Sequence, residues 1–444
     1  MQSLKKIIDP ENLLNPGVII NNDPRAHLKN LKSLPIVEQE VDKCIECGYC
    51  EHKCPSRDIT MTPRQRIVVR REMARLKSKN EIEKLQLLYK EYQYDGMDTC
   101  AVDGLCASEC PVSINTGDLI KRLRNENHSA FENKVANLIS KNFKLVEFSL
   151  KAIMKTGSFI NKILWSKSMF KFTRSLHELT PMIPVWPESL TSTARLPKIK
   201  SGKSEVVYFP ACISRMMGAS ATQKLSLPQT FIKLADKARI KVHPFESING
   251  LCCGQAFSSK GFQNAAAYTM NKTIATLFEI SNHGQLPIVI DVTSCTYTFL
   301  TSSQFLTDEN QEKLKKMQIL DSIEYALQYL IPKLNIVNKK NNVVIHPVCT
   351  LTKMNLNQTF KNLAEKCANT VSSPIHAGCC GMAGDRGFFF PELTASAVRE
   401  EAIEVNKNSF DGYYSSAKTC EISLSGNSGN NYESILYLLD EVSE

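Results

Sequence analysis

The chain has 444 residues, of which 43% are hydrophobic and 22% are charged, and its formal net charge is +9 at pH 7. This length suits roughly two to four domains, and the hydrophobic content is ordinary for a globular protein. No apolar run reaches about 18 residues, and the N-terminus lacks an apolar core with a cleavage site, so we expect neither a membrane-spanning helix nor a signal peptide.

Sixteen cysteines stand out in this composition. Cysteines at this density form disulfides, bind zinc or hold iron–sulfur clusters. Disulfide frameworks are typical of small secreted domains, and this chain shows neither property. The spacing of the cysteines is therefore the evidence that distinguishes zinc sites from iron–sulfur clusters.

Residues 1–36 form a short lead-in with turn signals at 9–12 and 15–17. The segment is too short to be a domain. It is typical of the end of something larger.

Residues 37–125 contain two groups of cysteines, separated by a charged stretch with helical periodicity. The first group has the Cys-x2-Cys-x2-Cys-x3-Cys-Pro spacing of bacterial ferredoxins, in which the fourth cysteine binds the other cluster. Structural zinc sites instead use well-separated pairs of cysteines. The spacing therefore predicts iron–sulfur clusters, with a first group formed by Cys44, Cys47, Cys50 and Cys54.

The second group has the spacing Cys-x5-Cys-x3-Cys-Pro, and Asp103 stands where the ferredoxin template has its second ligand. On that template, the last cysteine of each group binds the cluster that the other group holds. Asp103 is either a weak iron ligand, so that this cluster readily becomes a [3Fe-4S] form, or a turn residue that faces water. The predicted sets are Cys44, Cys47, Cys50 and Cys110 for one [4Fe-4S] cluster, and Cys54, Cys100, Cys106 and Asp103 for the other.

Residues 126–203 lack cysteine, are rich in lysine and have apolar residues at helical spacing up to a proline-rich end. Their basic charge indicates either a solvated face or a surface that docks on an anionic membrane or an acidic redox partner. We expect a helical linker region here.

Residues 204–444 contain an internal repeat, with predicted domains at 204–300 and 301–444. Each half has a strand, a cysteine, a helix, a Cys-Cys-Gly turn, a helix, a strand and a further cysteine. Alternating strands and helices predict small α/β domains with parallel sheets, whose sites form at the carboxyl ends of strands. The repeated cysteines are Cys212, Cys252, Cys253 and Cys295, then Cys349, Cys379, Cys380 and Cys420.

Four thiols at strand ends suit a cluster or zinc, although packed free thiols are the alternative. Cys367 has no counterpart in the other repeat, and we expect it to be a buried free thiol. His243, His346 and His376 do not match between the repeats, so we expect structural or supporting roles for them.

The repeats resemble the cysteine-rich (CCG) domain shared by heterodisulfide reductase and by iron–sulfur subunits of glycolate oxidase and of anaerobic glycerol-3-phosphate dehydrogenase. In that family the domain often ends in Cys-x2-Cys, whereas 295–298 and 420–423 lack the last cysteine. The lead-in at 4–17 looks like the end of vanillyl-alcohol-oxidase-type flavoproteins. The whole arrangement resembles the C-terminal half of bacterial fused FAD/iron–sulfur D-lactate dehydrogenases.

This resemblance implies an α-helical ferredoxin domain followed by two small α/β cysteine-rich domains. It implies an oxidoreductase component that carries electrons from FAD, on a partner subunit or a missing domain, to a cytochrome or quinone. We expect a cytoplasmic protein, either free or peripheral on the inner face of the membrane, with no nucleic-acid partner. The alternatives are a heterodisulfide-reductase-like thiol–disulfide oxidoreductase subunit and a non-catalytic zinc scaffold.

Overall fold

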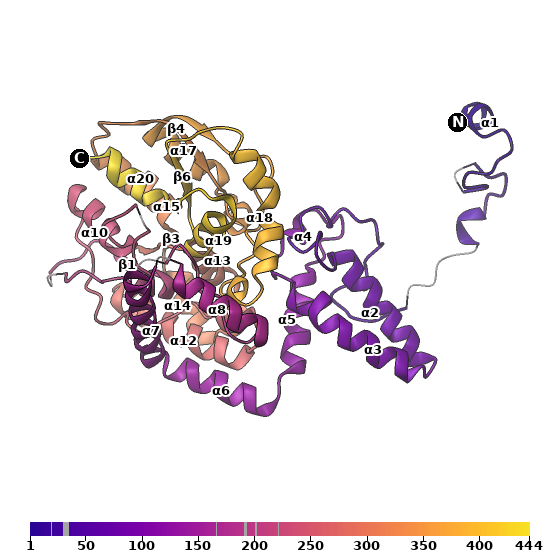
Figure 1. Ribbon diagram of the computed structural model, residues 1–444, viewed down its shortest axis with the longest axis horizontal. Coiled ribbons are helices and arrows are strands. Elements are labelled where there is room, and N and C mark those ends of the chain that lie inside the picture. The colour runs from indigo at the N-terminus through magenta and orange to yellow at the C-terminus, as the bar shows by residue number, and fades with distance from the viewer. Residues whose placement is uncertain (19, 30–34, 166, 191–192, 200–201, 221) are drawn as a thin grey trace.

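The computed structural model describes residues 1–18, 20–29, 35–165, 167–190, 193–199, 202–220 and 222–444. Figure 1 shows an N-terminal segment that stands apart, a helical domain beside it and a larger body that contains both sheets. The C-terminus lies on this body, far from the N-terminus. No helix in the described residues is both long and apolar enough to cross a bilayer.

The N-terminal segment has little structure of its own. It contains α1 (Gln2–Ile8) and one 3-10 turn, η1 (Ala26–Leu28), and neither element buries a residue. Large side chains such as Ile7 and Leu13 are mostly exposed. The described residues of this segment therefore contribute nothing to a hydrophobic core.

The helical domain follows and is built on two helices in contact with each other and a third helix that completes its core. Thr62 and Gln65 cap the first of these in a reciprocal capping box, with Pro63 in the first turn, which fixes where the helix begins. Ile67, Leu119 and Leu123 pack in the core. The elements are α2 (Pro63–Ser78), α3 (Ile82–Tyr92), the π-helical turn η2 (Gln93–Asp98), α4 (Leu105–Ser108) and α5 (Thr116–Asn127).

Three consecutive helices then run along the outside of the body: α6 (Ala130–Lys141), α7 (Phe143–Ile163) and α8 (Ser168–Leu179). Each is in contact with the next, and α6 also packs against α12 (Gln263–Ile280). These helices join the helical domain to the first sheet.

The first sheet has three parallel strands in the order β1-β2-β3: β1 (Val207–Phe209), β2 (Ile288–Ile290) and β3 (Ile319–Asp321). All nine of its residues are buried, which explains why they are apolar or aromatic apart from Asp321 at the end of β3. β3 lies beyond residue 300, so this sheet extends past the predicted end of the first repeat. Its helical elements are α9 (Cys212–Met216), α10 (Leu227–Lys237), α11 (Gln255–Ser258), α12, α13 (Thr293–Thr301), η3 (Ser303–Phe305), α14 (Asp308–Lys316), α15 (Ser322–Tyr325), η4 (Ala326–Leu330) and η5 (Ile331–Lys333).

The second sheet has four parallel strands in the order β5-β4-β6-β7, and one hydrophobic core joins it to the first sheet. The pairing of β4 with β6 and of β6 with β7 repeats the pattern of β1, β2 and β3. The strands are β4 (Lys340–Ile345), β5 (Ala368–Ser372), β6 (Gly412–Ser415) and β7 (Tyr432–Ser434). The helices are α16 (Cys349–Lys353), α17 (Asn357–Cys367), η6 (Arg386–Phe388), α18 (Pro391–Val405), α19 (Lys418–Ser428) and α20 (Ile435–Val442).

Candidate functional site

The first group of thiols lies in the loop that precedes α2. Cys44, Cys47, Cys50 and Cys110 line one small cavity, together with Gly48, Arg64 and Ile67. Gly48 has φ +87°, a conformation that residues with side chains rarely adopt, and it allows a tight turn between Cys47 and Cys50, which both line the cavity. The tertiary structure thus places Cys110 with the first three cysteines.

The second group lies on the other side of the start of α2. Cys54, Cys100 and Cys106 line a second cavity with Asp103 and Arg66. Cys54, the last member of the first run, is therefore beside the cysteines of the second run. The two cavities contain the sets that the crossed arrangement requires, and iron binding by each residue stays a prediction.

The donor chemistry fits iron–sulfur clusters. Burial raises the pKa of Cys50 to about 11 and that of Cys106 to about 12, so these thiols are protonated when nothing binds them. Cluster iron supplies the positive charge that holds buried cysteines as thiolates. Soft thiolates arranged around a common cavity are the ligands that such clusters use.

Asp103 has a local role that is visible in the structure. Its Oδ1 accepts a hydrogen bond from the backbone N–H of Leu105 at 2.7 Å, next to Gly104 with φ +77°, where α4 begins. The same carboxylate lines the second cavity. The turn role is therefore observed, and Asp103 also lines the cavity of the second thiol group, where its role as a ligand stays a prediction.

The four thiols of the first repeat are enclosed in the body. Cys212 and Cys295 follow the carboxyl ends of β1 and β2, and the Cys-Cys-Gly turn lies against them. The Sγ atoms of Cys212 and Cys252 are 3.7 Å apart, and those of Cys253 and Cys295 are 3.3 Å apart. A hydrogen bond with Cys252 and burial raise the pKa of Cys212 well above its usual value.

A buried ion pair supports this first site. The Arg215 side chain is fully buried, and its Nη2 donates to Glu147 Oε2 at 2.9 Å. Arg215 also donates to the carbonyls of Pro210 and Leu251, which flank two of the cysteines. The pair therefore ties α7 to both thiol-bearing loops.

The four thiols of the second repeat have a different environment. Cys380 and Cys420 have their Sγ atoms 2.8 Å apart, and the Gly381 N–H donates to Cys379 Sγ at 3.5 Å. Cys349 and these three cysteines line a cavity of about 230 Å³ that also contacts the helical domain and α13. Gly381, with φ +76°, lies so close to Leu393 that a Cβ would be 2.8 Å from its carbonyl oxygen.

This cavity connects the second repeat with the second thiol group. Ala101, Val102 and Asp103 line it from the helical domain, and Cys379 packs in one buried cluster with Ala101 and Leu105. Lys353 donates to the Asp103 carbonyl at 2.8 Å, and its Nζ lies 3.9 Å from the ring centroid of Tyr297. None of the first repeat's four cysteines lines this cavity. The two repeats are therefore not equivalent.

The remaining candidates lie elsewhere. Buried His346 bonds to Glu401 through Nδ1 at 2.8 Å, and exposed His376 lies 3.4 Å from Glu400. Cys367 is buried at the end of α17, and burial raises its pKa to about 12. His243 is half-buried, and burial lowers its pKa.

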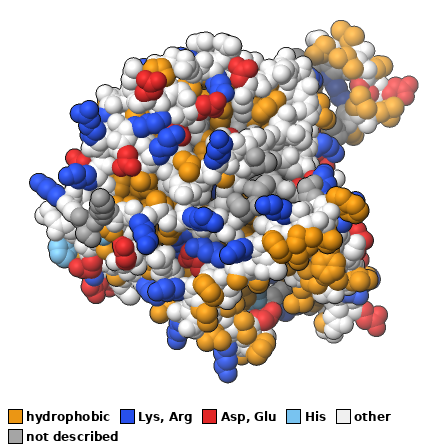
Figure 2. Space-filling model, turned by 60° about the vertical axis from the view of Figure 1, so that its left-hand side comes forward, with side chains coloured by type: hydrophobic (Ala, Val, Ile, Leu, Met, Phe, Trp, Pro, Cys, Tyr) orange, Lys and Arg blue, Asp and Glu red, His pale blue; other side chains and the backbone are white. Residues whose placement is uncertain are grey.

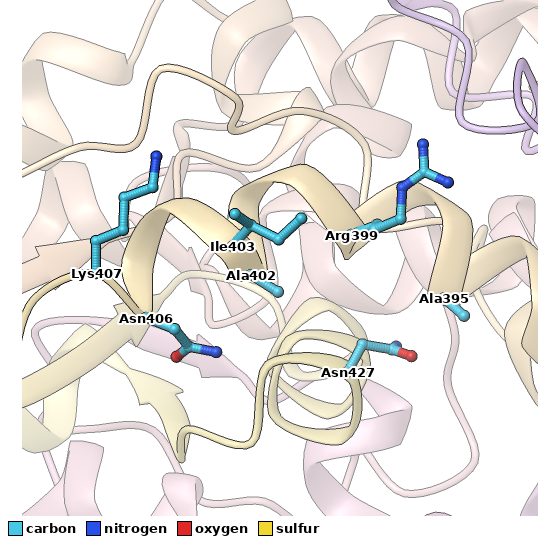
Figure 3. Close-up of a pocket in the computed structure, with 7 residues that line it drawn as sticks. All are labelled: Ala395, Arg399, Ala402, Ile403, Asn406, Lys407 and Asn427. Atoms are coloured by element: carbon cyan, nitrogen blue, oxygen red, sulfur yellow. The ribbon is translucent and has the colours of Figure 1, made fainter.

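Two further observations limit the site. In the part of the chain that the structure describes, no three His, Cys, Asp or Glu side chains converge on a position for a single metal ion. A cavity of about 520 Å³ lies between α18 and α19. Arg399, Lys407 and Asn427 are among the residues that line it (Figure 3). No cysteine lines that cavity, so it does not belong to the thiol sites.

Comparison with protein families agrees with this geometry. Residues 40–114 match the 4Fe-4S dicluster domain, and residues 206–300 and 343–425 each match the cysteine-rich domain. The chain contains a 4Fe-4S dicluster domain and two cysteine-rich domains. The predicted fold class, a ferredoxin-type helical domain followed by two α/β cysteine-rich domains, is confirmed.

A curated relative covers part of the chain. The "Uncharacterized protein YkgE" of Escherichia coli (strain K12) is 22% identical over 228 residues, which is 50% of this chain and 90% of that protein. The domain content fits an iron–sulfur subunit of the glycolate oxidase and lactate dehydrogenase type, and it indicates an electron-transfer component of an oxidoreductase.

Arg66 is a residue of the dicluster domain that sequence reasoning missed. It is 1% exposed, and its Nη1 lies 3.5 Å from Cys54 Sγ, while Nη2 donates to Ser56 Oγ at 2.8 Å. A buried cation beside a cluster ligand favours the reduced, more negative cluster. In the sequence, Arg66 is one of several arginines on an amphipathic helix, and no pattern singles it out.

We predict that Arg66→Gln lowers the reduction potential of the second cluster by about 50–100 mV, because one positive charge next to Cys54 is lost. Potentiometric titration followed by electron paramagnetic resonance measures this shift. Arg64→Gln is the matched control, since Arg64 lines the first cavity and is about one-third exposed. An unchanged second potential in Arg66→Gln would contradict the assignment.

The ligand role of Asp103 can be tested separately. We predict that the wild-type second cluster converts to a three-iron form on mild oxidation, and that Asp103→Cys abolishes this conversion because thiolate binds iron more tightly. Electron paramagnetic resonance quantifies the three-iron signal. Asp103→Asn keeps an acceptor for the Leu105 N–H and should retain the signal. Equal three-iron content in Asp103→Cys and wild type would leave Asp103 with the turn role alone.

Proposed function

We propose that this chain is the iron–sulfur electron-transfer component of a FAD-linked D-2-hydroxy acid dehydrogenase of the D-lactate or glycolate type. A 2-hydroxy acid gives up two electrons and two protons when it becomes a 2-oxo acid, and FAD accepts both electrons. Clusters accept one electron at a time, so a chain of them connects such a flavin to a cytochrome or quinone.

The cavity shared by the dicluster domain and the second cysteine-rich domain is the observation that supports a chain of carriers. Cys44, Cys47, Cys50 and Cys110 would hold one cluster, and Cys54, Cys100 and Cys106 with Asp103 the other. Asp103 of the second set also lines the cavity that contains Cys379 and Cys380, whereas Cys54, Cys100 and Cys106 line only the neighbouring one. This gives the order first cluster, second cluster, second cysteine-rich domain.

The position of the lead-in supports a flavin partner at the opposite end. The N-terminal segment stands beyond the dicluster domain, on the far side from the cysteine-rich domains (Figure 1). If it belongs with a FAD-binding domain or subunit, as its sequence suggests, the flavin would lie next to the dicluster domain. Electrons would then enter there and leave from the body.

The experiment is anaerobic purification with iron, zinc and acid-labile sulfide analysis, followed by mixing with the co-purifying FAD protein and D-lactate or glycolate. We expect matching iron and sulfide, and substrate-dependent appearance of reduced-cluster signals in electron paramagnetic resonance. Zinc without sulfide would exclude electron transfer and leave the zinc scaffold. Clusters that stay oxidised with every 2-hydroxy acid would exclude the hydroxy acid dehydrogenase.

A heterodisulfide-reductase-like function is the second candidate, because the thiols of the second repeat open into a cavity with polar walls. Cys380 and Cys420 are close together there, and Ser294, Thr298 and Asn115 also line the space. Reduction of a small disulfide by the cluster-reduced protein, lost in Cys380→Ala, would favour this function. Absence of such turnover would favour the dehydrogenase component.

A further inference from the structure

An unusual apolar surface covers the outside of α6, α7 and α8. We call it the helical face, and define it by twelve large apolar side chains that are each at least 58% exposed. Isolated apolar side chains are normal on a surface, but a concentration of this size marks an interaction site. The residues are Phe131, Leu138, Leu145, Phe148, Ile153, Phe159, Ile163, Leu164, Trp165, Phe172, Leu179 and Met182.

α7 has apolar side chains on both of its sides, whereas a helix on the surface of a globular protein normally has one apolar stripe, which faces the core. Its inward side has buried Phe143, Glu147, Met154 and Gly157. Leu145, Phe148 and Phe159 recur at helical spacing on the outward side and are 62–70% exposed. The ion pair between Glu147 and Arg215 holds the helix in this orientation.

Lysines follow one edge of this outward stripe. At 100° per residue, Lys144, Lys155 and Lys162 fall within about 20° of one another, beside the apolar side chains. All three are exposed, and none forms an ion pair within the described residues. The helix therefore presents an apolar strip with a positively charged border.

Neighbouring helices extend the same pattern. Phe131 and Leu138 are two turns apart on α6, and Trp165, Phe172 and Leu179 are spaced by seven from the α7–α8 loop through α8. Residues 131–182 contain nine Lys and Arg but three Asp and Glu. Figure 2 shows hydrophobic side chains gathered on the lower part of this side of the molecule, with basic side chains between and beside them.

This combination fits a lipid surface better than a protein partner. Lysine is depleted in protein–protein interfaces, whereas helices that lie in the plane of a membrane have Trp, Phe and Leu on one face and Lys beside them. Anionic headgroups complement the lysine border, and an exposed tryptophan suits the interface between headgroups and acyl chains.

We propose that the helical face docks the protein on the surface of an anionic lipid bilayer, with the apolar strip of α7 and the Trp165 side chain inserted among the lipids. The face lies on the cysteine-rich body and not on the dicluster domain. Docking through it would hold the body against the membrane. The proposal does not depend on the proposed function, because it concerns lipid binding alone.

The two tryptophans of the chain allow a direct test with the intact protein. Trp165 is 81% exposed on the helical face, and Trp186 is 8% exposed. The probes are vesicles of equal parts phosphatidylglycerol and phosphatidylcholine, compared with pure phosphatidylcholine. We expect co-sedimentation with the anionic vesicles and a blue shift of tryptophan emission that persists in Trp186→Phe and disappears in Trp165→Phe. No binding to anionic vesicles, or no blue shift, would overturn the proposal.

Variants separate the apolar and the charged contributions. Phe148→Ser/Phe159→Ser/Phe172→Ser should weaken vesicle binding at least about a hundredfold, because three exposed rings no longer insert. Lys144→Gln/Lys155→Gln/Lys162→Gln should weaken binding to anionic vesicles by about fivefold for each lysine, and leave binding to neutral ones unchanged.

The matched control is Leu87→Ser/Ile375→Ser/Ile403→Ser, which removes three apolar side chains that are 58–89% exposed elsewhere. It should bind vesicles as wild type does. Equal loss of binding in the control and the phenylalanine variant would overturn the proposal. So would a wild-type dimer that the phenylalanine variant converts into a monomer with unchanged vesicle binding, since the face would then be an interface between copies.

Discussion

Replacing Cys110 with alanine should abolish the first cluster and preserve the second, although Cys110 belongs to the second run of cysteines. The structure places this thiol in one cavity with Cys44, Cys47 and Cys50. A [4Fe-4S] cluster with one ligand missing is readily lost, so we expect the dicluster domain to lose about half of its iron and acid-labile sulfide. Metal analysis and electron paramagnetic resonance measure the loss and identify the remaining cluster.

Cys106→Ala should have the opposite selectivity and remove the second cluster. Cys367→Ala is the matched control, because Cys367 is equally buried but lies in α17, outside the four thiol sets. It should keep the full iron content. Loss of the second signal in Cys110→Ala, with the first retained, would show that each run binds its own cluster.

Arg215→Met should lower the free energy of unfolding by about 3–5 kcal/mol, because it leaves the buried Glu147 carboxylate without its partner. Glu147 also accepts a hydrogen bond from the backbone N–H of Gly250 and forms an ion pair with Lys151 at 3.1 Å. All of its polar neighbours therefore stabilise the ionised carboxylate. Denaturant unfolding by circular dichroism measures the change. Arg174→Met is the control, since Arg174 and Glu178 are both more than 60% exposed, and it should cost less than about 1 kcal/mol.

The same pair predicts a pH dependence. Burial opposes ionisation of Glu147, but its hydrogen bond and ion pair with Arg215 outweigh this and hold its pKa below the ordinary value. A carboxyl group whose pKa is depressed by folding stabilises the protein above its unfolded-state pKa and loses that contribution as the pH falls through the folded-state value. Wild type should therefore lose stability in acid below about pH 4.5, and Arg215→Met should lose less over that range. Parallel pH profiles for both proteins would exclude this role of the pair.

Short-range spacing explains why candidate cluster ligands could be recognised in the sequence. Ligands two or three residues apart are set by the local backbone, so the ferredoxin run could be recognised without a fold. The same template predicted that Cys54 lies with the second run and Cys110 with the first. The structure places both residues in the cavities that this arrangement requires. The Cys-Cys-Gly turns could also be recognised from the sequence. Each consists of three adjacent residues, and each stands at the same place in a repeated succession of apolar strands and helices.

Contacts between distant segments could not be predicted. Arg66 contacts Cys54 from a helix on which several arginines look alike, and only the packing shows which of them lies beside this thiol. β3 is three residues long, and its membership of the first sheet depends on pairing with β2. Such pairing has no local signal, because its energy comes from burial on both faces.

The sequence by itself determined the ligand chemistry, the two cysteine runs and the repeated α/β domains, since each depends on residues close together in the chain. Only the tertiary structure decided that the cysteines of the second repeat, and not those of the first, line a cavity together with Asp103 of the dicluster domain. It also decided which apolar side chains of α7 are buried, such as Phe143 and Met154, and which are exposed, such as Phe148. Periodicity defines the faces of a helix, but which face is buried depends on what the rest of the chain packs against it.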